Sequence, residues 1–86
     1  MKKIIVLCGE NCGYCKKAKM LIKRALEKDP RYRCLDIRYI RDDSQAGKQL
    51  EHSLVPAFYC DGTLTFEGNP DMDTIKAILA ECCMAD

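Results

Sequence analysis

A pair of cysteines at the junction between a predicted strand and a predicted helix restricts the fold of this chain more than any other feature. Lys3–Leu7 is a short apolar run rich in β-branched residues, which predicts a buried strand. Gly9–Asn11 predicts a loop. A helical pattern begins at Cys12 and ends before Asp29-Pro30, because the residue before a proline avoids the helical conformation. The predicted apolar face of this helix consists of Tyr14, Ala18, Leu21, Ile22 and Ala25.

The segment after this helix predicts a second strand and a short helix. Cys34–Ile40 alternates between apolar and polar residues, which is typical of a strand with one buried face. Cys34 is interpreted as a packing residue of that strand. Asp42–Leu50 is polar and compatible with a helix, although Gly47 weakens this prediction.

A hairpin follows in the second half of the chain. Asp61-Gly62 is a strong signal for a two-residue turn. It joins two short runs that we predict to be strands, Ala57–Cys60 and Thr63–Phe66. Cys60 is interpreted as a packing residue.

The last helix completes the order β-α-β-α-β-β-α. Asn69 is predicted to cap this helix and Pro70 to occupy its first position. Its apolar face consists of Met72, Ile75, Ile78, Leu79 and Cys82. The first half is a βαβ unit with parallel strands, and the hairpin adds an antiparallel half. We therefore expect an α/β fold with a four-stranded mixed sheet flanked by three helices, in a single domain over residues 1–86.

The charge and the apolar runs argue against several classes of partner. The net charge is +1, from 14 basic and 13 acidic residues, which gives no electrostatic reason to expect nucleic acid or a membrane surface. Lysines and arginines crowd the helix after the cysteine pair, either as a solvated face or as a positive field that favours thiolates. No apolar run approaches the ~20 residues of a membrane span, and the one after Met1 is too short for a signal peptide. We expect a cytosolic monomer.

Cys12 and Cys15 have the spacing and the position of a redox pair. Seven cysteines without an export signal favour catalytic or metal-binding thiols over a disulfide scaffold. Cys12 stands at a helix N-terminus, where free N–H groups and the macrodipole stabilise a thiolate, the reactive form of cysteine. Cys15 is one turn further along the same face and can close a disulfide with Cys12. A C-x-x-C pair at the strand-to-helix junction of a βαβ unit indicates a thioredoxin-like redox motif.

Cys8 precedes this pair in a C-x3-C-x2-C arrangement and leaves alternatives open. Three close thiolates could hold an iron–sulfur cluster or, with a fourth ligand, zinc. The spacing also matches the cluster motif of radical S-adenosylmethionine enzymes, but 86 residues are too few for their barrel. Cys8 is otherwise a small core residue or a third redox thiol.

Three motifs together resemble the glutaredoxin family over essentially the whole chain. Residues 12–15, CGYC, are similar to the family's C-P-Y-C site. Residues 54–56, LVP, resemble its T-V-P segment, where the proline is cis in the thioredoxin fold. Residues 68–71, GNPD, fall where the family has a glycine pair and then an aspartate at the last helix.

The resemblance implies a thioredoxin fold and the reduction of disulfides and glutathione mixed disulfides, with glutathione as electron donor and disulfide-containing proteins as partners. Cys12 would be the nucleophile and Cys15 the resolving thiol. The implied glutathione-binding residues are Tyr14, Val55, Pro56, Gly68, Asn69 and Asp71. The chain departs from the family at Gly13, at Glu67 and at Glu10-Asn11. Because of these departures, two alternatives to the glutathione-dependent function stay open. One is a carrier of a [2Fe–2S] cluster bound through Cys12, and the other is a thioredoxin-like electron donor that does not use glutathione.

Overall fold

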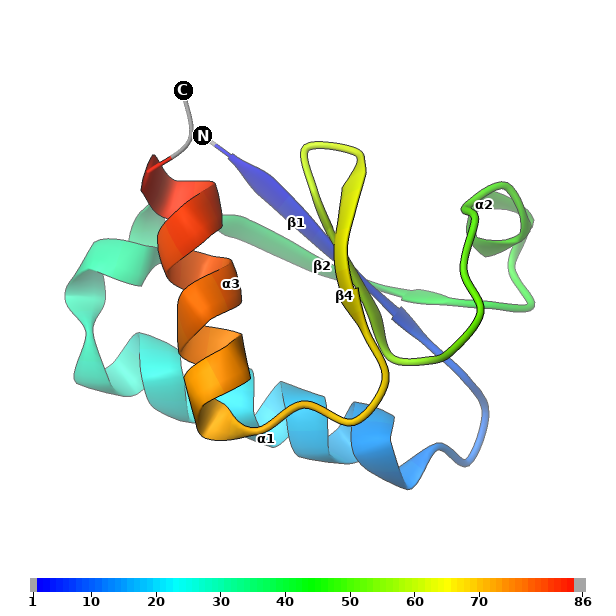
Figure 1. Cartoon of the computed structure of the whole chain (residues 1–86), viewed down its shortest axis with the longest axis horizontal. Coiled ribbons are helices and arrows are strands. Elements are labelled where there is room, and N and C mark those ends of the chain that lie inside the picture. The colour runs from blue at the N-terminus through cyan, green and yellow to red at the C-terminus, as the bar shows by residue number, and fades with distance from the viewer. Residues whose placement is uncertain (1, 85–86) are drawn as a thin grey trace.

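The computed structural model describes residues 2–84 and has the predicted element order (Figure 1). The elements are β1 (Lys3–Cys8), α1 (Gly13–Lys28), the 3-10 helix η1 (Pro30–Cys34), β2 (Asp36–Arg41), α2 (Gln45–Lys48), β3 (Ala57–Cys60), β4 (Thr63–Glu67) and α3 (Met72–Met84). Within the described range, none of the helices is long and apolar enough to cross a membrane.

The four strands form one mixed sheet in the order β2-β1-β3-β4. β1 runs parallel to β2, with Ile4 opposite Ile37. It runs antiparallel to β3, where Ile4 is opposite Cys60. β3 and β4 form the antiparallel hairpin. The prediction of a four-stranded mixed sheet in a thioredoxin fold is therefore confirmed.

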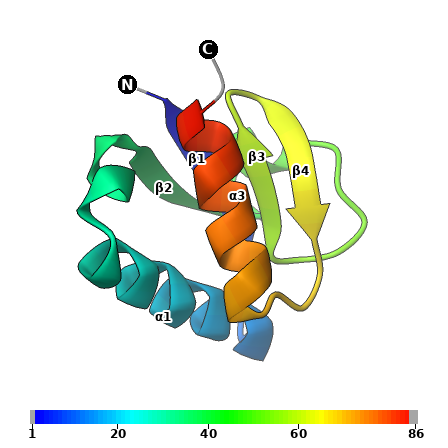
Figure 2. The ribbon, with the colours of Figure 1, turned by 60° about the vertical axis from the view of Figure 1, so that its left-hand side comes forward.

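The core has two layers, one on each face of the sheet. Helices α1 and α3 lie side by side over one face (Figure 2) and enclose the larger cluster, to which Ile4, Val6 and Phe58 contribute from the sheet. A smaller cluster covers the opposite face around Leu7 and Tyr59. Ile4 and Val6 belong to the larger cluster and Leu7 to the smaller one, so β1 is buried on both faces, which agrees with its apolar run from Ile4 to Leu7.

Helix α1 follows the predicted periodicity with one correction at its start. Its buried residues are Cys15, Ala18, Leu21, Ile22 and Ala25. Tyr14 was predicted on the same face, but its side chain is 53% exposed. Tyr14 lies in the first turn, and Cys15 is the first α1 residue that reaches the core. The helical spacing was therefore predicted correctly, but the burial of Tyr14 in the first turn of the helix was not.

The prediction of a strand from Cys34 was wrong. Asp29 accepts the N–H of Arg31, and Pro30 starts a 3-10 helix that runs to Cys34. A proline at the first position of a helix is favourable because its missing N–H has no partner there in any case. The strand begins only at Asp36, and Cys34 is exposed, so it is not the packing residue that we expected.

Two further predictions in the second half need correction. Helix α3 begins at Met72, so Asn69 does not cap it and Pro70 precedes it. The cap is Asp71, whose Oδ1 accepts the N–H of Thr74 at 2.8 Å. Cys60 is not a free packing thiol but forms a disulfide with Cys82 in α3, with 5.7 Å between the Cα atoms.

Candidate active site

The sulfur of Cys12 caps helix α1. Cys12 has an extended backbone, and its Sγ accepts the N–H of Cys15 at 3.3 Å. Asn11 precedes it with a φ of 55°, a left-handed conformation that asparagine tolerates better than most residues. This residue lies in the tight turn between β1 and α1. The predicted position of Cys12 at the helix N-terminus is confirmed.

Cys15 is the buried partner of the pair. Its side chain is 3% exposed, and its Sγ accepts the N–H of Gly9 at 3.4 Å. The pKa of Cys15 is raised to about 12, mainly by burial and secondly by the hydrogen bond to Cys12. Cys15 is therefore a protonated thiol at neutral pH. The two sulfurs differ in accessibility, because Cys12 is only half-buried.

Cys8 lies in the core beneath the pair. Its thiol is buried and donates to the carbonyl of Val6 at 3.7 Å. Burial raises its pKa. Residues 2–84 hold no group of three or more His, Cys, Asp or Glu side chains placed to hold a metal ion. This position matches the interpretation of Cys8 as a small core residue, and a role as a third redox thiol stays a prediction.

The loop before β3 meets the cysteine pair. The Val55-Pro56 peptide bond is cis. The carbonyl oxygen of Val55 lies 3.9 Å from the Sγ of Cys12. The N–H of Gly68 donates to the carbonyl of Pro56 at 2.9 Å, and Gly68 has a φ of 106°. The structure thus brings together five of the predicted site residues from three separate segments: Cys12, Cys15, Val55, Pro56 and Gly68.

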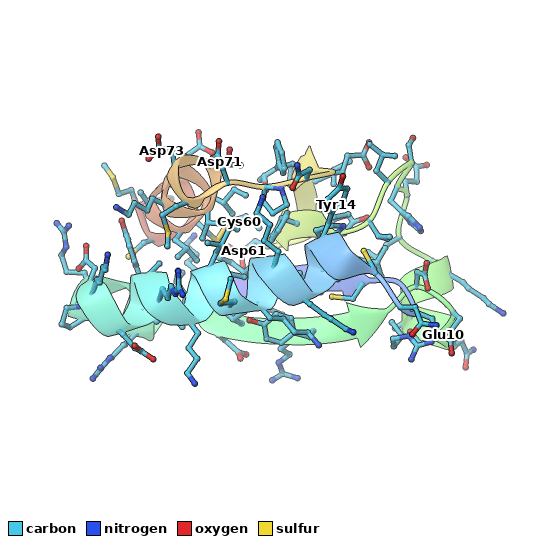
Figure 3. All side chains as sticks on the ribbon, turned by 90° about the horizontal axis from the view of Figure 1, so that it is seen from below. Glu10, Tyr14, Cys60, Asp61, Asp71 and Asp73 are labelled. Carbon is cyan, nitrogen blue, oxygen red and sulfur yellow. A yellow bond between two sulfur atoms is a disulfide. The ribbon has the colours of Figure 1, made fainter. Side chains whose placement is uncertain are left out.

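The other three predicted residues lie on the surface around this centre. Asn69 accepts a hydrogen bond from the Nζ of Lys17 at 3.1 Å, which links the segment before α3 to α1. The hydrogen bonds that Asp71 accepts from Thr74 lower its pKa, so its carboxylate is charged at neutral pH. Figure 3 shows Tyr14 and Asp71 projecting on the same side of α1, while Glu10 points away from them.

Glu67 has a role that the sequence analysis missed. Its Oε2 accepts the N–H groups of Ser53 and Leu54, at 2.9 and 3.4 Å. The carboxylate therefore holds the loop that leads into Val55. Leu54 itself is 57% exposed. Ser53 and Glu67 are 14 positions apart, and the residues between them carry no periodic signal from which this contact could have been predicted.

Comparison with known proteins agrees with the fold. A family model described as "Thioredoxin domain" matches residues 2–80. No curated protein matches the sequence. Solved structures do: the oxidised thioredoxin of Plasmodium falciparum is 15% identical, with a TM-score of 0.72, 93% of this chain covered and 79% of that one. The thioredoxin Mala s 13 of Malassezia sympodialis is 17% identical, with a TM-score of 0.75 and coverage of 95% and 75%. Thioredoxin O2 of Arabidopsis thaliana is 19% identical, with a TM-score of 0.68 and coverage of 94% and 74%.

Proposed function

The chain belongs to the thioredoxin domain family, and from this premise we propose that it is a thiol-disulfide oxidoreductase that acts through Cys12 and Cys15. The observation that carries the proposal is the unequal environment of the two sulfurs. Cys12 is accessible and accepts an N–H at a helix N-terminus. Cys15 is buried and holds its proton at neutral pH. A nucleophile and a resolving thiol need this difference.

The reaction consists of two exchange steps. The thiolate of Cys12 attacks one sulfur of the substrate disulfide, and the other sulfur leaves as a thiolate and takes up a proton. Cys12 and the substrate are then joined by a mixed disulfide. Cys15 next gives up its proton and attacks the Sγ of Cys12, which releases the second substrate thiolate. The protein ends with a Cys12–Cys15 disulfide, and the substrate has gained two electrons and two protons.

The segment around Val55 is where we place the substrate. Val55 is half-buried, and its carbonyl lies beside the sulfur of Cys12. An extended peptide bound along this backbone would have its disulfide sulfur next to Cys12. Exposed Tyr14 and Leu54 add apolar surface for such a partner.

For the reductant we propose glutathione. Its cysteine would lie beside Tyr14 and pair with the backbone of Val55, next to Pro56. Its γ-glutamyl end would reach Gly68 and Asn69, just before α3. There the charged carboxylate of Asp71 suits the ammonium group of the γ-glutamyl residue, and Lys17, which contacts Asn69, suits a carboxylate.

A second candidate is a thioredoxin-like electron donor that does not use glutathione. Glu67 favours it, because its carboxylate is bound to the backbone of Ser53 and Leu54 beside the proposed glutathione site. A negative charge there disfavours an anionic tripeptide.

A coupled assay on a glutathionylated substrate separates the two candidates. One arm supplies glutathione and glutathione reductase, and the other supplies thioredoxin reductase alone. Turnover with glutathione supports the glutathione-dependent function, and turnover with thioredoxin reductase alone supports the electron donor. Cys12→Ser is the control and must be inactive in both arms.

Inactivity of the native protein in both arms would contradict the proposed function. It would favour the remaining alternative, a carrier of a [2Fe–2S] cluster held by Cys12 from two copies together with glutathione. Visible absorbance after anaerobic purification, lost in Cys12→Ser, is the measurement for that alternative.

A further inference from the structure

Two thiols outside the candidate active site, those of Cys34 and Cys83, face each other. The Sγ atoms of Cys34 and Cys83 are 3.2 Å apart, although 49 positions separate these residues in the sequence. Cys34 ends η1 and is exposed, whereas Cys83 lies in the last turn of α3 and is half-buried. Two thiols at this separation need only a small approach to form a disulfide.

This second pair lies at the other end of α1 from Cys12. Cys12 caps the start of α1, while Cys34 ends the 3-10 helix that follows the end of α1. The 16 residues of α1 span about 24 Å at 1.5 Å per residue. Figure 1 shows η1 beside the C-terminal end of α3, away from the start of α1. The surface pair is therefore separate from the proposed redox centre.

We propose that Cys34 and Cys83 form a second thiol-disulfide exchange site, which accepts oxidising equivalents directly from low-molecular-weight disulfides. In the first step one of the two cysteines, as a thiolate, attacks the small disulfide R–S–S–R, and one RS⁻ leaves. In the second step the other thiol loses its proton and attacks the protein sulfur of the mixed disulfide, and the second RS⁻ leaves. The small disulfide is reduced to two thiols, and the protein gains a Cys34–Cys83 disulfide.

The surroundings assign a different step to each thiol. Cys34 is the more exposed and is open to attack on a solvent-borne disulfide. Cys83 keeps its proton because its hydrogen bond to Cys34 raises its pKa. Cys34 is therefore the attacking thiol and Cys83 the resolving one.

A small cavity beside Cys83 offers space for the rest of the disulfide. Its volume is about 220 Å³, and its lining consists of Arg31, Tyr32, Ala80, Cys83 and Met84. The carbonyl of Arg31 is 3.8 Å from the sulfur of Cys83. The guanidinium of Arg31 forms a salt bridge with Asp29 at 2.7 Å. Because this pair neutralises the positive charge of Arg31, the cavity can accept an uncharged ligand as well as a charged one.

The test uses the reduced full chain, native and as Cys12→Ser, treated with oxidised glutathione. Free thiols are then blocked, and trypsin is added. Cys34 lies in the tryptic peptide 34–38, Cys60 in 49–76, and Cys82 and Cys83 in 77–86. We expect peptide 34–38 to be recovered bound to 77–86 in monomeric protein from both forms. The Cys12→Ser form shows that the active site does not relay the oxidation.

Two variants show which thiol attacks and which resolves. They also distinguish a disulfide to Cys83 from one to Cys82, since both residues lie in peptide 77–86. In Cys83→Ser we expect peptide 34–38 to carry one glutathione adduct. In Cys34→Ser we expect a much lower adduct yield on 77–86. The thermal midpoint should rise more on oxidation of the native chain than on oxidation of Cys34→Ser, which can still form the Cys60–Cys82 disulfide.

Three results would overturn the proposal. The first is recovery of peptide 34–38 without a link to 77–86, the second is a link that survives in Cys83→Ser, and the third is a link found only between two copies of the chain. Because these readouts are link formation and stability, they are independent of the reductase assays for the proposed function.

Discussion

The amide nitrogen of Cys15 lies 3.3 Å from the sulfur of Cys12, so the buried cysteine of the pair donates its backbone N–H to the accessible one. This contact stabilises negative charge on Cys12 and places the two sulfurs within one helical turn. We therefore expect Cys12→Ser to abolish reduction of every substrate. Cys15→Ser should retain activity on glutathione mixed disulfides, which require one thiol, and lose it on protein disulfides. The measurement is the coupled assay, with Cys34→Ser as a control of unchanged activity. An active Cys12→Ser variant would show that the nucleophile is misassigned.

The burial of Cys15 predicts its pH dependence. A pKa of about 12 keeps this thiol protonated at neutral pH, and only the thiolate is alkylated. The Cys12→Ser variant loses the contributions of Cys12, but burial, the largest cause, remains, so the pKa of Cys15 stays above its usual range. Its alkylation rate should therefore rise about tenfold per pH unit from about pH 7 to beyond about pH 9. The same variant should lose stability as the pH rises above the ordinary thiol pKa, because the folded state retains the proton longer than the unfolded state. Mass spectrometry of the tryptic peptide 4–16 follows the rate. A plateau near pH 9 would contradict the raised pKa.

Glu67 provides a test of the reductant. Glu67→Gln keeps an oxygen that can accept from Ser53 and Leu54 but removes the negative charge. If glutathione binds at Val55 and Asn69, the KM for glutathione should fall by up to about fivefold, the effect of removing one charge close to the surface. Glu81→Gln removes the same charge from an exposed site in the last turns of α3 and should leave the KM unchanged. An equal effect of both variants would show that only net charge matters.

Gly47 is predicted to be intolerant of a side chain. A Cβ at this position would lie 2.1 Å from the carbonyl oxygen of Arg41, which is backbone and cannot move aside easily. Gly47→Ala should lower the free energy of unfolding by about 1–3 kcal/mol. At Gly13, by contrast, a Cβ meets nothing within 4 Å. Gly13→Ala should therefore raise the free energy of unfolding by up to about 1 kcal/mol. Urea denaturation of both variants measures the two changes. A Gly47→Ala variant as stable as the native chain would contradict the prediction for Gly47.

The Cys60–Cys82 disulfide should contribute measurably to stability. It closes a loop with a sequence separation of 22, for which the loss of chain entropy in the unfolded state corresponds to about 3 kcal/mol. Replacing both cysteines by alanine should lower the free energy of unfolding by about this amount under non-reducing conditions. A reductant should lower that of the native chain and leave the variant unchanged. Equal stability of native and variant chains without reductant would contradict this prediction.

The sequence was sufficient to predict the fold because the signals were local. The apolar run of β1, the helical spacing of α1 and the Asp61-Gly62 turn each determine one element from adjacent residues. The element order then implies a mixed sheet, as the structure shows. Errors arose at the ends of elements, where a cap decides the boundary. Asp71 rather than Asn69 caps α3, and Asp29 with Pro30 replaces the start of the second strand by η1.

Contacts between distant segments could not be predicted in the same way. The carbonyl of Val55 lies beside Cys12 because β3 pairs with β1, and the family resemblance, not the periodicity, pointed to this contact. The partners of Cys60, Cys83 and Glu67 depend on the packing of α3 and of the loop before β3. A side-chain contact of this kind leaves no pattern in the intervening residues.

The burial of Cys15 also gives the proposed reaction a fixed sequence of events. A protein disulfide meets Cys12 first and, where no small thiol is supplied, is released by Cys15. When Cys15 is replaced by serine, a protein substrate stays covalently attached at the halfway point. The Cys15→Ser chain then traps its protein substrates covalently. They can be isolated from the cell together with it, and mass spectrometry can identify them.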